Sequence, residues 1–472
     1  MIPDDDRIGG DSLEQLNQVG LLSVMYDVEP DMEVTELVPR CSLPQQCTRL
    51  QKNETADQIG QCRANGRISR LDWIPSSSME CPILDSELTW SDLQQKCFEV
   101  FGQGAVFGAN RTVKDIGEGK GNVARCCLID PDWTLQPNKF LTKICLIPKD
   151  DSGKDTDYAA TTRKIHNVEC TIYKLLTKYK NKEILIPKIY SVVAYSEKNT
   201  HKGYIIMEHV NDAVTLNVWD NLTMDELKQA LRLIAALQAV SLQFTQEEKQ
   251  TLSYNPLYDI FKQVKNPNSD KSKTTVSSSN GFNDFVRDTP VWQTSREYIR
   301  ILPDIYDLDF MYANMGKELG ILPVLVHADA WSTNFLWRKT DEGLKLVSVL
   351  DFQTSYLGMP GGDVMRVMST FLSHKDRKEH WDELIEYFYN TFLSMIGDMP
   401  APYKLDQLHE NIRRYYPMVR LAFAIPQSFW KKESSFDEET KKKVKDVLLE
   451  KMRGIMEDTV FYHERNNRLK QK

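Results

Sequence analysis

The chain lacks the features that would indicate a membrane, secreted or nucleic-acid-binding protein. No apolar run approaches the roughly 20 residues that a membrane-spanning helix needs. The first six residues, MIPDDD, lack the basic and apolar segments of a secretory leader, which predicts a cytoplasmic protein without a membrane partner. The formal net charge of −8 argues against a nucleic-acid partner, because nonspecific binding of nucleic acid needs a basic surface.

Cysteine is absent from the larger part of the chain, and its spacing does not fit a metal site. All nine cysteines precede residue 171, and no C-x-x-C pair occurs, so we expect no zinc site. An odd cysteine count without a secretory leader predicts free thiols in a reducing compartment. The alternative is a small disulfide-bonded unit formed by the cysteines at positions 41, 47, 62 and 81.

What is present is the composition of a globular protein, with 472 residues of which 41% are hydrophobic and 27% charged. Residues 1–80 are polar with scattered hydrophobics, which predicts a poorly ordered or appended extension. Strand-like segments are concentrated in residues 81–210, and helical periodicity dominates residues 211–472. This asymmetry predicts an α+β fold with a small antiparallel-sheet N-lobe and a large, mainly helical C-lobe.

The most informative stretch follows a short apolar run that ends at residue 326. It begins with His327, Asp329 and Asn334, three polar residues within eight positions. Two β-prone segments then follow, at 335–337 and 344–350, and the turn between them predicts a hairpin.

The hairpin returns the chain to Asp351, so we expect Asp351 to lie beside Asn334 and Asp329. Two carboxylates and an amide that converge in this way suit Mg²⁺ ligation together with a separate base. Phosphoryl transfer needs that set of groups. The alternative is that these polar residues only cap the hairpin.

A glycine-rich segment lies between two other β-prone segments. Gly117, Gly119 and Gly121 occupy alternate positions, and glycine lets the backbone approach phosphate oxygens closely. The spacing is not that of a Walker loop, and no Ser or Thr follows the lysine. We interpret the segment as a hairpin that covers phosphates, although glycine-rich hairpin turns without a ligand are also common.

A lysine and a glutamate are expected to pair inside the first lobe. Lys143 lies in the centre of an apolar strand predicted over residues 140–147, and Glu169 lies on the apolar face of a helix predicted over residues 161–179. Because an unpaired buried ammonium is costly, these positions favour an ion pair. The alternative is that both charges extend to solvent at the edge of the core.

Together these motifs resemble the aminoglycoside phosphotransferase/choline kinase superfamily, whose members have a bilobal protein-kinase-like fold. The likeness rests on HADAWSTN at 327–334 and DFQ at 351–353. Within the superfamily, the chain is most similar to the CHK kinase-like (ecdysteroid-kinase-like) family, in particular its nematode branch, from about residue 83 onward. One departure is Ala328, where the family usually has glycine. If this position has a positive φ, alanine would strain the loop.

The resemblance implies that ATP and Mg²⁺ bind between the lobes. The residues that it places around the nucleotide are Gly117, Gly119, Gly121, Lys143, Glu169 and Glu208. It implies Asn334 and Asp351 as metal ligands. It also implies that Asp329 accepts or orients the substrate hydroxyl, and that His327 fixes the geometry of the loop. Asp363 would brace the same loop and cap the helix that follows.

The expected activity is therefore phosphorylation of a hydroxyl group on a small organic molecule. The resemblance favours a steroid-like alcohol or a xenobiotic conjugate, and a polar amino alcohol such as choline is the competing acceptor. A catalytically inactive kinase-like scaffold or nucleotide-binding protein is the alternative. A protein kinase is disfavoured, because only a short linker separates Asp351 from Asp363. The sequence does not indicate an oligomeric state.

Overall fold

The structure, a computed structural model, describes most of the chain from residue 79 onward. The described ranges are 79–84, 86–116, 124–149, 152–156, 158–264, 281–301, 309–419 and 421–470. The predicted N-terminal extension lies outside the described residues except for its last two positions, and so does the segment with Gly117, Gly119 and Gly121. The cysteines at positions 41, 47 and 62 also lie outside them, whereas the cysteines of the described part have free thiols.

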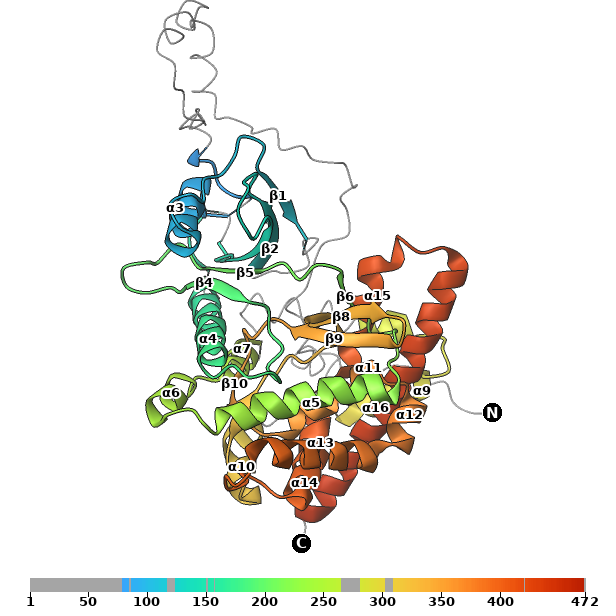
Figure 1. Cartoon of the computed structure of the whole chain (residues 1–472). Helices are drawn as coiled ribbons and strands as arrows, with labels where there is room; N and C mark the ends of the chain where they lie inside the picture. Colours follow the sequence, from blue (N-terminus) through green and yellow to red (C-terminus); the bar gives the residue numbers. More distant parts are fainter. Residues whose placement is uncertain are drawn as a thin grey trace, which may run out of the picture.

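The N-lobe is built on a five-stranded antiparallel sheet in the order β1-β2-β3-β5-β4. Its strands are β1 (Thr112–Asp115), β2 (Ala124–Asp130), β3 (Phe140–Cys145), β4 (Ile189–Val193) and β5 (Tyr204–Glu208). Its helices are α3 (Trp90–Phe101) and α4 (Ala159–Lys178). Figure 1 shows α3 beside the sheet and α4 below it, towards the C-lobe. The central position of β3 lets its side chains reach both faces of the sheet.

Side chains alternate along β3, so they serve two different surroundings. Phe140 and Ile144 join a hydrophobic cluster that includes Leu93 and Cys97 of α3. Lys143 has the opposite parity and points away from that cluster. Because side chains alternate along this apolar strand, the ammonium group of Lys143 lies on the face of the sheet that meets α4 and the C-lobe.

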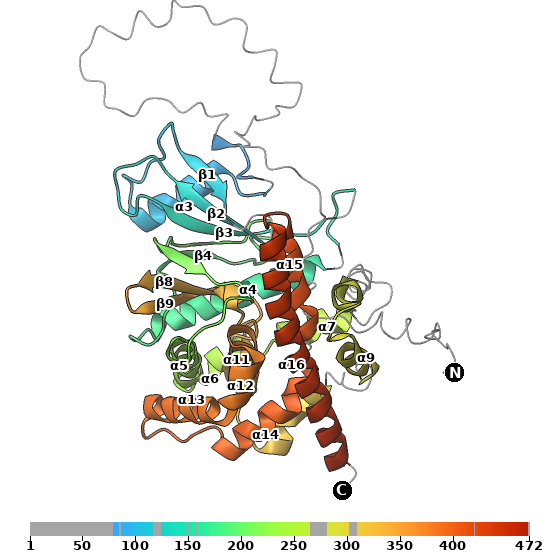
Figure 2. The ribbon, with the colours of Figure 1, turned by 90° about the vertical axis from the view of Figure 1, so that its right-hand side faces the viewer.

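The C-lobe is mainly helical. Its longer helices are α5 (Met224–Ser241), α7 (Pro256–Val264), α9 (Trp292–Ile301), α11 (Gly361–Phe371), α13 (Trp381–Ile396), α14 (Leu405–Tyr415), α15 (Ile425–Glu433) and α16 (Glu438–Lys470). Its short helices are α6 (Gln246–Thr251), α10 (Met315–Leu319), α12 (His374–Glu379), the π-helix η5 (Phe310–Asn314) and the 3₁₀ helices η6 (Ser332–Asn334), η7 (Tyr416–Val419) and η8 (Leu421–Phe423). Figure 2 shows α16 running along the lobe to the end of the chain.

The predicted hairpin is confirmed as β8 (Phe335–Thr340) and β9 (Gly343–Val349), which pair antiparallel. Two further pairings were not predicted. The strand β6 (Ala213–Thr215) pairs with β8, and β7 (Val324–Val326) pairs with β10 (Tyr356–Gly358). The last pairing places residue 327, which follows β7, beside the segment between β9 and β10.

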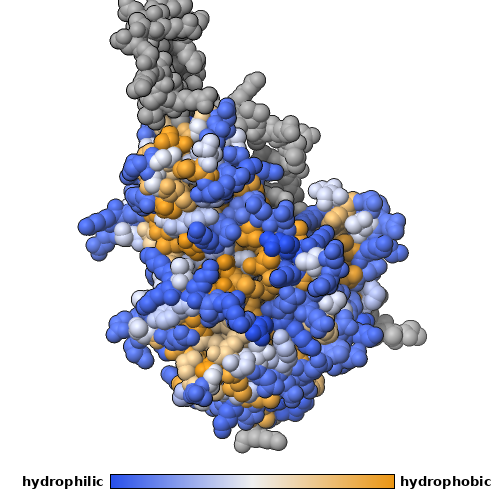
Figure 3. Space-filling model, viewed as in Figure 1, coloured by the Kyte–Doolittle hydropathy of each residue, from blue (hydrophilic) through white to orange (hydrophobic). Residues whose placement is uncertain are grey.

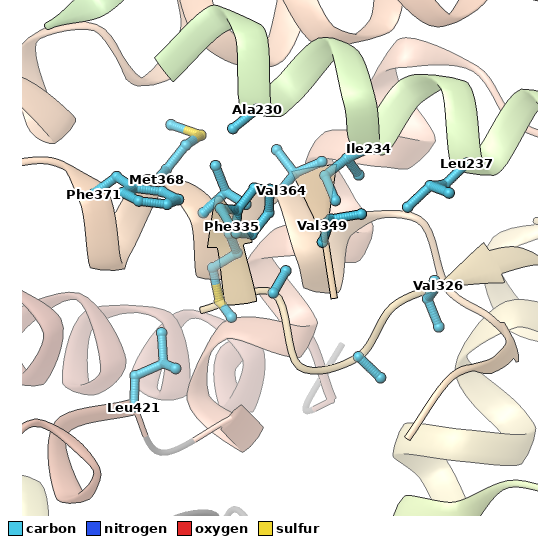
Figure 4. Packing of buried hydrophobic residues seen from close by; sticks show 14 of the residues in the cluster. Ala230, Ile234, Leu237, Val326, Phe335, Val349, Val364, Met368, Phe371 and Leu421 are labelled. Carbon is cyan, nitrogen blue, oxygen red and sulfur yellow. The ribbon is translucent and has the colours of Figure 1, made fainter. Parts of the chain in front are cut away.

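The helix α5 packs against one face of the hairpin. Figure 4 shows Ala230, Ile234 and Leu237 of α5 facing the strands that carry Phe335 and Val349. All five side chains are buried, and burying a large aliphatic or aromatic side chain contributes about 1.5–3 kcal/mol. The ends of the hairpin, where Asn334 and Asp351 lie, are thus attached to a packed core.

The predicted α+β fold with an antiparallel-sheet N-lobe and a mainly helical C-lobe is confirmed. The exact division between the lobes at residues 210 and 211 stays a prediction. In the described part of the chain, no helix combines the length and the apolar composition that crossing a membrane requires. On the face drawn in Figure 3, hydrophobic surface gathers where the two lobes meet, and hydrophilic surface covers most of the remainder.

Candidate active site

Lys143 forms the centre of a charged cluster between the lobes. Its Nζ donates to both carboxylate oxygens of Glu169, at 3.0 and 2.8 Å, and to Oδ1 of Asp351, at 2.8 Å. The ion pair expected between Lys143 and Glu169 is therefore present, and Glu169 is fully buried. Burial lowers the pKa of Lys143, but Asp351 and Glu169 raise it more, so the net pKa is well above its ordinary value and the ammonium stays protonated.

Asp351 lies two residues after the end of β9, and its backbone has a left-handed φ of 69°. The preceding residue, Leu350, donates its N–H to the backbone oxygen of Asn334 at 2.9 Å. The β8–β9 pairing thus brings the segments of Asn334 and Asp351 together, as the sequence predicts. The side chain of Asp351 is 20% exposed, so it is accessible to a ligand while it holds Lys143.

His327 connects the two halves of the site through its ring and its backbone. Its Nε2–H donates to the backbone oxygen of Leu350 at 2.9 Å, and its Nδ1 accepts the N–H of Asp329 at 3.3 Å. The hydroxyls of Thr354 and Ser355 donate to its carbonyl oxygen, at 3.3 and 3.1 Å. With both ring nitrogens engaged and the residue fully buried, His327 is suited to fixing geometry rather than to exchanging protons.

Asp363 holds the start of the loop formed by residues 327–334. Its carboxylate accepts the amide N–H of His327 at 2.7 Å and that of Ala328 at 2.9 Å. It does not cap the following helix, because α11 already begins at Gly361 and Asp363 lies in its first turn. The expectation that Asp363 is a cap is therefore wrong, and both of its oxygens serve the loop. Ala328 has a φ of 66°, so the strain expected at this position is present.

Asp329 and Asn334 are in direct contact. The Nδ2 of Asn334 donates to the backbone oxygen of Asp329 at 2.8 Å and to its Oδ2 at 3.3 Å. Because the amide nitrogen is turned towards Asp329, the amide oxygen of Asn334 is left to accept or to ligate. Burial raises the pKa of Asp329, and the charge of Arg366 acts in the opposite direction.

The donor set fits a magnesium ion shared with phosphate groups. Asn334 offers an amide oxygen and Asp351 a carboxylate, which are the hard oxygen ligands that Mg²⁺ prefers. Among the described residues, no three His, Cys, Asp or Glu side chains form a cluster able to hold a metal by themselves. A site with one or two protein ligands is the usual form for Mg²⁺ that also binds substrate phosphates.

Glu208 does not join this cluster. It ends β5 opposite Phe140, whereas Lys143 pairs with Ile205 of the same strand. Its exposed carboxylate accepts the N–H of Lys188 at 3.0 Å.

Sequence reasoning missed two hydroxyl contacts and one buried cation. Thr354 and Ser355, which donate to His327, had no motif that would indicate this role. Arg366 lies three residues after Asp363, in a helix whose every residue is buried.

Comparison with known proteins identifies relatives of this chain. Residues 82–467 match the model of the family DUF1679, which is described as "Uncharacterized oxidoreductase dhs-27". The "Uncharacterized kinase-like protein D1044.1" of Caenorhabditis elegans is 27% identical over 151 residues, which are 30% of this chain and 39% of that protein. The match thus spans about two fifths of that relative. The expected resemblance to a nematode kinase-like family is confirmed by these two matches.

Solved structures with a similar fold include choline kinase from Cryptosporidium parvum Iowa II. It has a TM-score of 0.42 and 13% identity, and the match covers 81% of this chain and 96% of that chain. A spectinomycin phosphotransferase in complex with ADP and spectinomycin has a TM-score of 0.40 and 15% identity, with 78% and 98% covered.

Proposed function

Because the chain belongs to the DUF1679 family, with a kinase-like nematode relative, we propose that it is an ATP- and Mg²⁺-dependent phosphotransferase. Its acceptor would be the hydroxyl group of a small organic molecule. The observation that carries the proposal is the junction at which Lys143, bound to Glu169, also binds Asp351 at 2.8 Å. Phosphate transfer needs a lysine and a metal-binding carboxylate side by side.

Each residue of the site has a task in this mechanism. Lys143, aligned by Glu169, contacts the nucleotide phosphates, and the glycine-rich segment covers them. Asp329 takes the proton of the acceptor hydroxyl. The hydroxyl oxygen then forms a bond to the γ-phosphorus while the bond from that phosphorus to its bridging oxygen breaks, so that ADP leaves.

The metal would be held by Asn334 and Asp351. Bound there, Mg²⁺ would neutralise negative charge on the phosphates. The hydrogen bonds of His327 and Asp363 would keep Asp329 and Asn334 in register with Asp351 through the reaction.

The family description names an oxidoreductase, so a dinucleotide site is the competing interpretation. Sites for nicotinamide dinucleotides use an open parallel sheet with a glycine-rich strand-to-helix turn. In the described part of the chain, every strand pairing is antiparallel. That architecture supports a phosphotransferase rather than an oxidoreductase that uses a nicotinamide dinucleotide.

For the acceptor, we favour an apolar or ring-bearing alcohol, such as a steroid-like alcohol or a xenobiotic conjugate, over choline. Trp331 lies in the catalytic loop and is partly exposed. Separately, Tyr258, Tyr312 and Tyr356 form a row of ring contacts, with centroid distances of 6.3 Å from Tyr258 to Tyr312 and 5.9 Å from Tyr312 to Tyr356. Aromatic side chains offer a large apolar contact area to a ring-bearing acceptor.

A thermal-shift titration with ATP, with and without Mg²⁺, tests the proposal. Saturation at about 100 times the Kd should stabilise the protein by roughly 2.7 kcal/mol. We expect this rise to need Mg²⁺, to be lost in Asp351→Asn and to be kept in Asp329→Asn, which instead loses about 10²–10⁴-fold in turnover. A wild type without any rise would favour the inactive scaffold, and full turnover in Asp329→Asn would remove the role given to that residue.

A further inference from the structure

Side chains of α4 hold the connector between β4 and β5, which is the segment of residues 194–203. The side chain of Asn167 makes two hydrogen bonds to the backbone of Tyr195: its Nδ2 donates to the carbonyl oxygen at 3.0 Å, and its Oδ1 accepts the N–H at 2.8 Å. One turn earlier on the helix, Arg163 donates through Nε to the backbone oxygen of Thr200 at 3.2 Å. Because the amide of Asn167 satisfies both backbone groups of one residue, it fixes the helix to the connector as a paired strand would.

The connector is in turn bound to the strand that carries Lys143. The backbone oxygen of Gly203 accepts the N–H of Cys145 at 2.8 Å, and Cys145 follows Lys143 by two residues on β3. A Cβ atom at Gly203 would lie 2.4 Å from Cε2 of Tyr195, so only glycine lets the connector pass this close to the tyrosine ring. Asn167 is therefore joined to β3 through one short, closely packed segment of backbone.

The same helix carries the acidic partner of Lys143. Glu169 lies two residues after Asn167, it is fully buried, and both of its carboxylate oxygens accept from Nζ of Lys143. Residues two apart on a helix project in nearly opposite directions, so Asn167 can act on this ion pair only through the position of α4. A displacement of the helix along the connector would move Glu169 relative to Lys143 by the same amount.

We propose that Asn167 is a positioning residue, which fixes α4 against the β4–β5 connector where Glu169 aligns Lys143 with the nucleotide phosphates. Its effect on ATP binding rests on the proposed function. Its effect on the ion pair between Lys143 and Glu169 does not, so the two can be tested separately.

A double-mutant cycle in thermal stability tests the effect on the ion pair. The proteins are the wild type, Asn167→Ser, Glu169→Gln and the double variant. Serine has a helix propensity close to that of asparagine but lacks the amide that binds Tyr195, and Lys143 keeps Asp351 as a partner in Glu169→Gln. We expect Asn167→Ser to lower Tm by about 1–2 °C more in the wild type than in the Glu169→Gln background, because the second background has no ion pair to misalign. Additive shifts would overturn the proposal.

Asn199 provides the matched control. Its Nδ2 donates to the backbone oxygens of Ala194 and Lys202, at 2.9 and 2.7 Å, so these hydrogen bonds stay within the connector. Asn199→Ser should lower Tm by the same amount with and without Glu169→Gln. If it couples to Glu169→Gln as strongly as Asn167→Ser does, an intact connector matters rather than the position of α4, and the inference fails.

The affinity for ATP tests the positioning. We expect Asn167→Ser to raise the Kd for ATP in the presence of Mg²⁺ about 3- to 30-fold, and Asn199→Ser to leave it unchanged. A purely structural role would lower Tm without changing this Kd, because titration well below Tm measures the folded protein. A coupled pair in Tm together with an unchanged Kd in Asn167→Ser would overturn the positioning role. A wild type that binds no ATP would overturn the proposed function, and the Tm cycle would still decide whether Asn167 aligns the ion pair.

Discussion

Two residues of the site, Ala328 and Asp351, have a backbone conformation that non-glycine residues rarely adopt. Their φ angles are 66° and 69°, in the left-handed region where a Cβ atom crowds the neighbouring carbonyl oxygen. Such strain persists only where surrounding contacts determine the backbone, and it is concentrated at functional sites. For Ala328 the contact is the hydrogen bond from its amide to Asp363.

Ala328→Gly should therefore stabilise the protein. Relief of the left-handed penalty, about 1–2 kcal/mol, outweighs the greater chain entropy of glycine in the unfolded state, about 0.5–1 kcal/mol. We expect Tm to rise by about 1–3 °C, with the Mg²⁺-dependent ATP shift retained. Thermal unfolding of the variant measures this.

Ala330 is the control for this substitution. It lies two residues along the same loop, it is fully buried, and it is not among the residues with positive φ. Ala330→Gly should lower Tm, because glycine adds its entropic cost and removes a buried methyl group there, with no strain to relieve. Equal effects of the two glycines would contradict the strain at residue 328.

Local sequence patterns indicated some buried charges and not others. Lys143 and Glu169 could be predicted because each interrupts an apolar pattern, so each must be buried and each needs a partner. Arg366 could not be predicted in this way. Its burial comes from packing of α11 against segments far away in sequence, and no local pattern records that packing.

At the scale of elements, features set by neighbouring residues can be predicted from local sequence. Thr89 and Asp92 have the spacing of a capping box and form one at the start of α3, and Thr223 and Glu226 form another at the start of α5. The pairing of β6 with β8 joins segments more than 100 residues apart, so it depends on tertiary contacts that periodicity does not contain. The start of α16 is harder to predict from sequence, because two nearby residues there have side chains that can cap a helix.

The spacing of Ser435 and Glu438 is that of a capping box, which predicts Ser435 as the N-cap of α16. In the structure, the N-cap is Asp437. The Oδ1 of Asp437 accepts the N–H of Thr440 at 2.7 Å, and helix α16 begins at Glu438. Asp437→Ala should therefore destabilise the protein by about 1 kcal/mol. Chemical denaturation measures the loss. Ser435→Ala is the matched control and should cost less than half as much; the opposite order would restore Ser435 as the cap.

At the scale of the whole molecule, one buried lysine connects the C-terminal helix to two distant segments. Lys451 of α16 is 1% exposed. Its Nζ donates to the backbone oxygens of Val218, before α5, and Thr370, at the end of α11, at 2.6 and 2.7 Å. Burial lowers the pKa of Lys451 to about 7, although Glu450 raises it. The contact of α16 with Val218 and α11 therefore depends on a lysine whose pKa in the folded protein lies far below its ordinary value.

The sign of the resulting pH dependence follows from linkage. Below pH 7 the lysine is protonated in both the folded and the unfolded protein. Between pH 7 and about 10.4, the ordinary pKa of lysine, the unfolded chain binds more protons at this residue than the folded protein does. The free energy of unfolding therefore rises with pH in this range, and the gain is lost again as the pH falls to 7. Lys451→Met removes this contribution.

We therefore expect the stability of the wild type relative to Lys451→Met to increase by about 4 kcal/mol from pH 7 to pH 10. Unfolding curves of both proteins across that range measure the difference, and other titrating groups cancel in it. Lys443→Met is the control, because its side chain is 79% exposed, and its difference from the wild type should stay flat. Parallel curves for the wild type and Lys451→Met would mean that the Lys451 ammonium is already well solvated or paired in the folded state, and the contact of α16 with α11 would then be independent of pH.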